Sequence, residues 1–399
     1  MAAAAELRPV LNHPVDARPG MTPEFELLLA CCAQSFNGSY VDQIISTRRC
    51  DWNRLISLAE HHRVIPQLYR SLAPHRTQLP DRHFAALRSI NEDNARKALW
   101  FTGELVRVLE HLEARGIRAM PYKGPALAQT LYGDVTAREF SDLDILVCPE
   151  DVRNAKAALA QLGYKSTIEL TARSERAYIS SGYEYSFDSL AGPHLLELQW
   201  RIVPRFYSVD LDAAILFERA EPVILGGHSF STLCLQDLLL VLCVHAAKHV
   251  WVQLSWLCDL AALAGSARVD WDAAWRQAHR LGLQRIVAVN LLLAHDLLGL
   301  PLPLPIQSWL KKDRVSEILK AEMLQIIQRS SHYATESIAY FRLMMRLRER
   351  RRDRFRFLWR LLWTPSIGEW SAMQLPEQLF PLYRGIRLFR LARRFAGHA

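Results

Sequence analysis

The chain has 399 residues, of which 50% are hydrophobic and 23% are charged, and its formal net charge is +8 at pH 7. This composition is typical of globular proteins, and the length suits one large or two ordinary domains. The seven cysteines form no C-x-x-C pair, which argues against both a disulfide framework and a zinc ribbon. We therefore expect a protein of a reducing compartment, and the cytoplasm is the simplest one.

Neither a secretory signal nor a transmembrane helix is expected. Residues 1–9 lack the basic segment and apolar core that mark a signal peptide. The longest apolar region, residues 233–264, contains the charged residues Asp237, Lys248 and Asp259. Charges at this density are too costly inside a bilayer, so no membrane span is predicted.

The first 115 residues predict helices only. Residues 22–71 begin with a Thr-Pro-Glu sequence, which favours a helix start because the threonine side chain can cap the first turn. Residues 81–115 form a second helical run, whose apolar stripe includes Leu105 and Leu109 and which ends at Gly116.

Residues 117–147 are the stretch where the backbone pattern and the chemistry coincide. Residues 117–122 form an apolar run that suits a buried strand, and a glycine turn at Gly124 interrupts it. Residues 125–132 then read as a helix with proline in its first turn, and residues 141–147 read as a second strand. Free backbone N–H groups at the start of such a helix attract phosphate, so this turn is a candidate phosphate site.

Asp142 and Asp144 fall on one face of the second strand, because side chains alternate along a strand, and Leu143 and Ile145 fall on the other. Two adjacent carboxylates raise each other's pKa and repel unless a cation lies between them. Carboxylate oxygens suit Mg²⁺ or Mn²⁺, which also binds substrate phosphates. The alternative is a solvated strand end, but strand, glycine turn, helix and D-x-D strand follow the order of a nucleotidyl-transfer site.

The segment from Lys123-Gly124 through Arg138-x-x-x-Asp142-x-Asp144 resembles the uncharacterised bacterial nucleotidyltransferase-fold family, a distant branch of the polymerase-beta-type superfamily. Residues 195–202 resemble the later strand that carries this family's third carboxylate, and residues 246–261 resemble its C-terminal helical part.

The resemblance implies a role for six residues. The catalytic carboxylates, which are also the metal ligands, would be Asp142, Asp144 and Glu197, and the nucleotide-binding residues would be Lys123, Gly124 and Arg138. An exposed strand acid is the alternative for Glu197, and ordinary surface charges are the alternative for Lys123 and Arg138. Gln199 departs from the family pattern, in which histidine commonly precedes the tryptophan, and this argues against an acid-base role there.

The residues that follow predict the rest of a small mixed sheet. Residues 149–162 read as a helix, and residues 164–170 and 183–190 read as strands, the latter because aromatic and polar residues alternate. Residues 194–202 follow a turn and form a further strand, in which Glu197 lies on the face opposite the aliphatic residues.

From residue 235 onward the hydrophobic period is helical. Helices are expected at residues 235–264, 271–281, 284–298 and 306–329, with a rigid proline linker at 301–305. Residues 333–360 and 375–395 are expected to be arginine-rich helices. They could bind nucleic acid or an anionic membrane, but arginine stems also cover helix surfaces, so a structural use is the main alternative.

Two histidines one helical turn apart, His245 and His249, invite a metal-site interpretation. The zincin pattern would need glutamate where this chain has Ala246. We therefore expect a packed or partner-bonded pair in place of a zinc site.

These patterns together predict an α+β fold, in which a nucleotidyltransferase-type small mixed sheet with helices is flanked by all-helical regions. The expected parts are an N-terminal helical region at 1–115, a catalytic domain at 116–230, and a C-terminal helical region with basic helices at 231–399.

The predicted function is metal-dependent transfer of an NMP group from an NTP, for which ATP is one candidate, to a hydroxyl acceptor with release of pyrophosphate. The acceptor could be a small molecule, a protein or an RNA. The alternatives are a catalytically inactive module that binds nucleotide or a partner, and a nucleic-acid binder that uses the arginine-rich helices.

Overall fold

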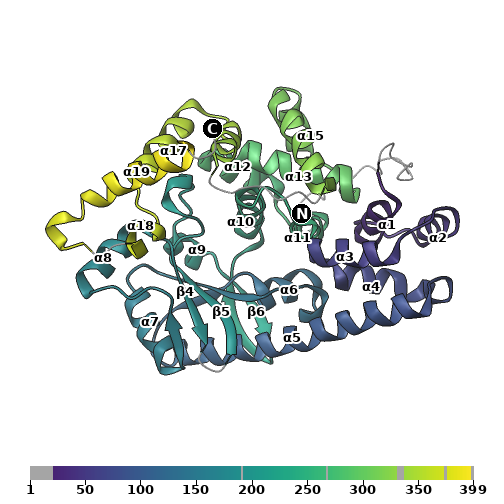
Figure 1. The fold of residues 1–399 in the computed structure, drawn as a ribbon, viewed down its shortest axis with the longest axis horizontal. Helices are drawn as coiled ribbons and strands as arrows, with labels where there is room; N and C mark the ends of the chain where they lie inside the picture. Colours follow the sequence, from purple (N-terminus) through teal and green to yellow (C-terminus); the bar gives the residue numbers. More distant parts are fainter. Residues whose placement is uncertain (1–20, 190–191, 267, 330–336, 373–374, 397–399) are drawn as a thin grey trace, which may run out of the picture.

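The computed structural model describes residues 21–189, 192–266, 268–329, 337–372 and 375–396 of the chain. The fold is α+β, as predicted, with one small mixed sheet among many helices (Figure 1). No helix among these residues is both long enough and apolar enough to cross a membrane.

The N-terminal region is helical, as the sequence predicts. Its helices are α1 (Pro23–Cys32), α2 (Gly38–Thr47), α3 (Trp52–His62), α4 (Ile65–Leu72) and α5 (Asp81–Glu113). The side chain of Thr22 accepts a hydrogen bond from the backbone N–H of Phe25 and so caps α1. The single long helix α5 runs beneath both the N-terminal helices and the sheet (Figure 1).

The main sheet has five strands in the order β1-β2-β5-β4-β3. The strands are β1 (Ala119–Pro121), β2 (Asp142–Val147), β3 (Tyr164–Ser166), β4 (Glu184–Ser189) and β5 (Gly192–Gln199). Strands β2 and β5 are parallel, and the other neighbours are antiparallel. Each predicted strand is therefore present, although β1 and β3 are shorter than expected.

The two faces of the sheet carry different side chains. Leu143, Ile145, Leu196 and Leu198 are buried in a core that α5 and helix α7 (Val152–Gln161) share. Because side chains alternate along a strand, the acids of β2 and β5 lie together on the opposite face. Helix α6 (Gly124–Tyr132) lies between β1 and β2 in the chain, where the sequence predicts a helix.

Three elements of this region are not predicted by the sequence patterns. They are helix α8 (Ala172–Ser181), helix α9 (Ala213–Glu218) and a hairpin of β6 (Glu221–Leu225) with β7 (His228–Thr232). The hairpin turn is Gly226-Gly227, and both glycines have positive φ, at 57° and 86°. A Gly-Gly pair between two short alternating runs is a hairpin signal, so the sequence did contain one.

The C-terminal region is helical throughout its described part. Its helices are α10 (Leu235–Lys248), α11 (Leu254–Gly265), α12 (Trp271–Leu281), α13 (Gln284–Leu298), α14 (Leu304–Leu310), α15 (Arg314–Arg329), α16 (Ile338–Arg346), α17 (Arg351–Trp363), α18 (Ile367–Ala372) and α19 (Leu382–Ala396). Residues 330–336, which include the start of the helix expected at 333–360, and residues 373–374, which precede the helix expected at 375–395, lie outside the described residues.

Five predictions for this region are wrong, at least in part. The single helix expected over residues 235–264 is divided into α10 and α11, and Val250 and Trp251 between them have a positive φ that no helix accommodates. The helix expected over residues 375–395 begins only at Leu382.

A single helix was expected over residues 306–329, but the helix is interrupted between α14 and α15. At this interruption Asp313 accepts a hydrogen bond from Ser316 and forms an ion pair with Arg285. The proline linker is also wrong in part, because Pro303 caps α14 and Pro305 lies in its first turn. The helix expected over residues 333–360 is likewise divided, between α16 and α17.

Two hydrophobic cores hold the fold together. The first joins the N-terminal helices to the C-terminal helices, and the second lies between the sheet, α5 and α7. Helix α5 belongs to both, since Phe84 and Leu87 lie in the first core and Leu105 and Leu109 in the second. The acid-bearing face of the sheet therefore lies where the two cores meet.

Candidate active site

Four acidic side chains gather on one face of the sheet. Asp142 and Asp144 lie on β2, Glu197 lies on the parallel strand β5, and Glu184 lies on β4. The register pairs Asp144 with Glu197, which brings the three carboxylates predicted from the sequence together. Asp144 is 3% exposed, so it is neither a solvated strand end nor a surface acid.

The turn before α6 supplies a backbone approach to these acids. Gly124 begins α6 with a φ of +53°, and a Cβ at this position would lie 3.3 Å from the backbone oxygen of Asp142. Glycine is required here both for the left-handed backbone and for this contact. The N-terminal N–H groups of α6 are thereby held beside the start of β2.

Lys123 occupies the N-cap position of α6, and its ammonium group contacts one of the acids. Its Nζ lies 2.7 Å from Oδ1 of Asp144, and its side chain is largely buried. Burial opposes the charge on Lys123, but Asp144, together with Tyr122 and Glu197, outweighs burial and raises the lysine pKa. Lys123 is therefore not an ordinary surface charge.

Gln199 is the hydrogen-bonding centre of the cluster. Its Nε2 donates to Glu197 at 2.7 Å, to Asp144 at 3.2 Å and to Glu184 at 3.4 Å. Its Oε1 accepts a hydrogen bond from the hydroxyl of Tyr122. An amide that donates to three carboxylates positions them without titrating, which agrees with the expectation that this residue has no acid-base role.

The acids are crowded enough to change their ionisation. Burial, together with the nearby Glu184 and Asp144, raises the pKa of Glu197 to about 8. Burial also raises the pKa of Asp142, helped by Asp144, and it raises the pKa of Glu184 against the opposing charge of Lys248. The cluster carries more carboxylate than its own cations neutralise.

The donor atoms are chemically suited to a hard divalent cation, because all are carboxylate oxygens. Within the described part of the chain, however, no three acidic, histidine or cysteine side chains are arranged so that they could hold a metal ion as they stand. Lys123 and Gln199 already donate to Oδ1 of Asp144. A cation bound to this oxygen of Asp144 would therefore compete with the ammonium group of Lys123.

Arg138 occupies a different position from the other nucleotide-binding candidates. Its Nε donates to Oδ2 of Asp259 on α11 at 2.9 Å, and Tyr132 donates to the other carboxylate oxygen of Asp259 at 2.9 Å. Arg138 is 8% exposed, yet its positive charge still acts on Asp142 and opposes the rise in the pKa of that acid. It links the sheet region to the C-terminal helices at the edge of the cluster.

A cavity of about 300 Å³ is lined by none of the four acids, but its lining includes Tyr183, which precedes Glu184 in the chain. Its lining also includes Lys248, His249, Tyr207 and Arg205. Lys248 connects it to the cluster, because its Nζ lies 5.2 Å from the ring centre of Tyr183 and its charge acts on Glu184.

His245 and His249 form a packed pair, as expected. Their ring centres are 4.7 Å apart, and each lies 5.4 Å from the ring centre of Trp256. Burial lowers the pKa of both, that of His249 to about 3. They are therefore neutral near pH 7 in the folded protein.

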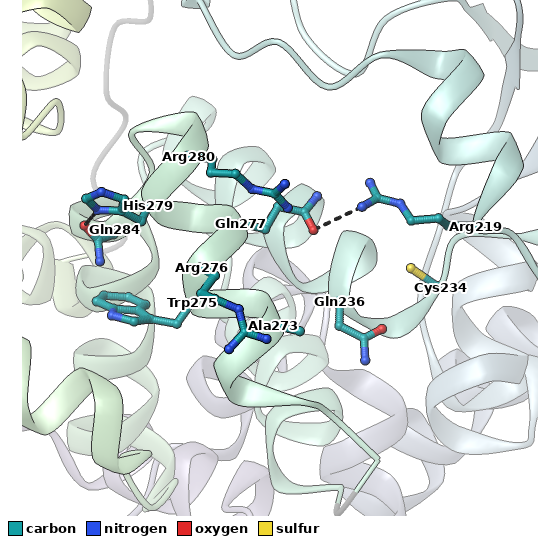
Figure 2. A pocket seen from close by; sticks show the side chains of 10 residues that line it. All are labelled: Arg219, Cys234, Gln236, Ala273, Trp275, Arg276, Gln277, His279, Arg280 and Gln284. Atoms are coloured by element: carbon teal, nitrogen blue, oxygen red, sulfur yellow. Dashed lines mark hydrogen bonds between the residues drawn. The ribbon is translucent and has the colours of Figure 1, made fainter.

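A larger cavity, of about 680 Å³, lies away from the acids (Figure 2). Figure 2 shows it between Arg219 and helix α12, with Arg276 and Arg280 on the helix side and a hydrogen bond from Arg219 to Gln277. None of its lining residues belongs to the acidic cluster. Size alone therefore does not locate the chemical site of this fold.

Three residues of the site were not assigned a role from the sequence: Gln199, Glu184 and Lys248. Glu184 had a signal, because it alternates with the aromatic residues of its strand and so faces the other acids. Lys248 also had one, because a lysine on a mostly apolar helix needs a partner if it is buried. Gln199 had the same signal, because it lies two residues after Glu197 and so on the same face of the strand, but only the register of β2 against β5 brings it to Asp144.

One family model matches more than half of the chain, and two solved structures are similar to part of it. Residues 48–299 match the model of a family described as uncharacterised nucleotidyltransferase. The chain is similar to the solution structure of the antibiotic-resistance factor ANT(2'')-Ia, with 17% identity, a TM-score of 0.32, and 44% of this chain and 92% of that chain covered. It is also similar to the crystal structure of ANT(2")-Ia in complex with adenylyl-2"-tobramycin, with 15% identity, a TM-score of 0.27, and 56% and 97% covered. A search of curated proteins gave no match.

Proposed function

We propose, from the premise that this chain belongs to the uncharacterised nucleotidyltransferase family, that it transfers an NMP group from an NTP to a hydroxyl of an acceptor. In this reaction the acceptor oxygen forms a bond to the α-phosphorus, and the bond from that phosphorus to the oxygen of the pyrophosphate leaving group breaks. The observation that carries the proposal is the placement of three carboxylates on adjacent parallel strands, beside the glycine turn that begins α6.

The carboxylates would hold the cation and the attacking group. Asp142, Asp144 and Glu197 would bind Mg²⁺ or Mn²⁺, which when bound neutralises the phosphate oxygens that carry charge in the transition state. Glu197 would also position the acceptor hydroxyl, and in its ionised form, which a bound cation favours, its carboxylate would take up the proton of that hydroxyl. Gln199 would keep the acids in place through its hydrogen bonds.

The triphosphate would bind at the turn before α6. The backbone N–H groups of Gly124 and Ala126, in the first turn of α6, would donate to a phosphate there, whereas Pro125 between them has no N–H. Lys123 would move from Asp144 to a phosphate oxygen as the nucleotide enters, which frees that carboxylate for the cation. Nε and Nη1 of Arg138 donate within the protein, so in this proposal its Nη2 would reach the phosphates.

The acceptor would occupy the 300 Å³ cavity that Lys248 and Tyr183 connect to the acids. Its aromatic and cationic lining would suit an acceptor with an apolar body and a negative group. Small molecules fit a cavity of this size better than a folded protein does.

The test is to incubate the purified chain with each labelled NTP and Mg²⁺ or Mn²⁺, with cell extract as the source of acceptor. We expect release of pyrophosphate and a labelled product, and loss of both in Asp142→Asn and Asp144→Asn. The matched control is Asp188→Asn, which removes an exposed acid from the neighbouring strand. Equal activity in all four proteins would refute the assignment of the site.

A second candidate is a nucleotide-binding module without catalysis. It is favoured by one observation, the contact of both Lys123 and Gln199 with Asp144, because these groups partly neutralise that carboxylate without a cation. This candidate predicts that nucleotide binds and that Asp142→Asn abolishes binding, while no NTP is turned over by any of the proteins.

A further inference from the structure

Helices α17 and α19 expose large apolar side chains. Phe355 is 69% exposed and Trp359 is 55% exposed on α17, and Phe389 is 68% exposed on α19. The other exposed members are Leu358, Leu362, Trp363, Leu382 and Leu388. We refer to these eight residues as the C-terminal apolar face, and the two helices that carry it lie together at one edge of the molecule (Figure 1).

The apolar residues exposed on α17 have the spacing of a helix face that is normally buried. Phe355, Leu358, Trp359 and Leu362 follow the i, i+3, i+4, i+7 pattern that normally faces a core. Here a different side of the helix, represented by Phe357, packs against the protein. Helix α17 thus has one apolar side that is buried and a second that faces solvent, and a contiguous exposed patch of this kind marks an interaction surface.

Positive charge surrounds this surface. Helix α17 contains five arginines and one aspartate, and α19 contains five arginines and no acidic residue. Arg351, Arg352, Arg384 and Arg393 are exposed. Arginine beside tryptophan, phenylalanine and leucine is the composition of helices that lie in the interface of an anionic bilayer.

Several other arginines of these helices are used within the protein. Arg356 and Arg360 pair with Asp210 at 2.8 and 2.9 Å, and Arg387 donates to the backbone oxygen of Leu361 at 2.9 Å. Some arginines of these helices therefore have a structural role, as expected. These are the arginines whose side chains contact the protein, and this role does not explain the exposed arginines. The whole surface also lies outside residues 48–299, which carry the family match.

We propose that the C-terminal apolar face docks the protein on an anionic phospholipid bilayer. The aromatic and leucine side chains enter the headgroup region, and the exposed arginines pair with lipid phosphates. The chain lies on the membrane in this arrangement and does not cross it.

The composition favours lipid over the other possible occupants. Nucleic acid would need aromatic faces free to stack on bases, but the rings of Phe355, Trp359 and Trp363 pack on one another in a row, with centres 6.4 and 5.5 Å apart. Half of the eight members are leucines, which neither stack nor form hydrogen bonds. A second copy of the chain would bring the same positive helices together, and like charges would oppose that contact.

The experiment is flotation of the full chain with vesicles of phosphatidylcholine alone or mixed with phosphatidylglycerol. We expect binding to the anionic vesicles that weakens as salt is added. The triple variant Phe355→Ser, Trp359→Ser, Trp363→Ser should bind at least about tenfold more weakly, since each ring loses its burial in the interface. The double variant Arg351→Gln, Arg384→Gln should bind anionic vesicles about tenfold more weakly than the unmodified chain does. Its affinity for vesicles of phosphatidylcholine alone should not change.

The matched control is Leu304→Ser, Ile318→Ser, which removes two exposed apolar side chains of 69% and 53% exposure elsewhere in the C-terminal region. It should bind as the unmodified chain does. The proposal is overturned if no vesicle binds the chain, or if the control loses as much affinity as the triple variant. It is equally overturned if the triple variant abolishes self-association or RNA binding while vesicle binding stays unchanged.

Discussion

Glu197 is an acid placed where its ionised form is unfavourable. In the folded protein without metal its pKa is raised to about 8 by burial and by its acidic neighbours, from an ordinary value of 4.5. The folded state therefore binds more protons than the unfolded state between these pH values. The stability that this group contributes is present below about pH 4.5 and is lost as the pH rises through about 8.

Replacing this acid by its amide should remove that pH dependence. We expect the free energy of unfolding of Glu197→Gln, relative to the unmodified protein, to increase by about 1–3 kcal/mol from about pH 5 to about pH 8. Thermal or urea unfolding in the presence of a chelator measures it. A difference that does not change with pH would mean that Glu197 is ionised in the folded state.

The same substitution should separate binding from chemistry. If Glu197 acts on the acceptor hydroxyl, Glu197→Gln should keep nucleotide affinity within roughly threefold and lower turnover by on the order of 10²-fold or more. Calorimetric titration with a non-hydrolysable NTP and a pyrophosphate-release assay report the two quantities. Unchanged turnover would exclude Glu197 as the third catalytic carboxylate. Glu184, whose carboxylate belongs to the same cluster, would then be tested.

At the scale of elements, the joint between β1 and α6 depends on Gly124. Gly124→Ala places a Cβ 3.3 Å from the backbone oxygen of Asp142, at a φ of +53° that alanine adopts with strain. We expect a loss of about 1–3 kcal/mol of stability and a loss of nucleotide binding, because the helix N-terminus moves away from the acids. Unfolding curves and nucleotide titration test this.

The control glycine lies inside α5. A Cβ at Gly103 would meet no atom within 4 Å, and alanine is favoured over glycine within a helix by about 1 kcal/mol. Gly103→Ala should therefore stabilise the protein and leave nucleotide binding unchanged. If both substitutions behave alike, the turn before α6 is not a special position.

Local patterns predicted the elements around the acids because each is encoded within a few residues. The alternation over residues 141–147, the proline at the start of α6 and the aromatic alternation of β4 were sufficient for this. The division of residues 306–329 was missed because it depends on Asp313 pairing with Arg285, which lies on another helix. Long-range register likewise decided that Gln199 meets the acids.

Across the whole molecule, Arg138 and Asp259 join the sheet to the C-terminal helices. This pair is buried, and Tyr132 shares the carboxylate. Asp259→Ala leaves the guanidinium of Arg138 buried without its partner, and we expect a cost of about 3–5 kcal/mol. The family resemblance implied nucleotide binding by Arg138, but no local pattern in the sequence reveals its partner Asp259, 121 residues away.

The surface pair of Asp210 with Arg356 and Arg360 is the comparison. Asp210 is about half exposed, so Asp210→Ala should cost no more than about 1 kcal/mol. Melting temperatures of the two variants, measured in parallel, decide the question. A similar small effect for both would show that Asp259 is not the joint between these regions.

Helix α5 has a consequence for how this protein can be divided. Its first half completes the core shared by the N-terminal and C-terminal helices, and its second half completes the core under the sheet. Residues 116–230 expressed alone would expose the apolar side of β2 and β5 that Leu105 and Leu109 cover. The five-stranded sheet is therefore not expected to fold without α5. A chimaeric protein that contains this sheet must also contain α5.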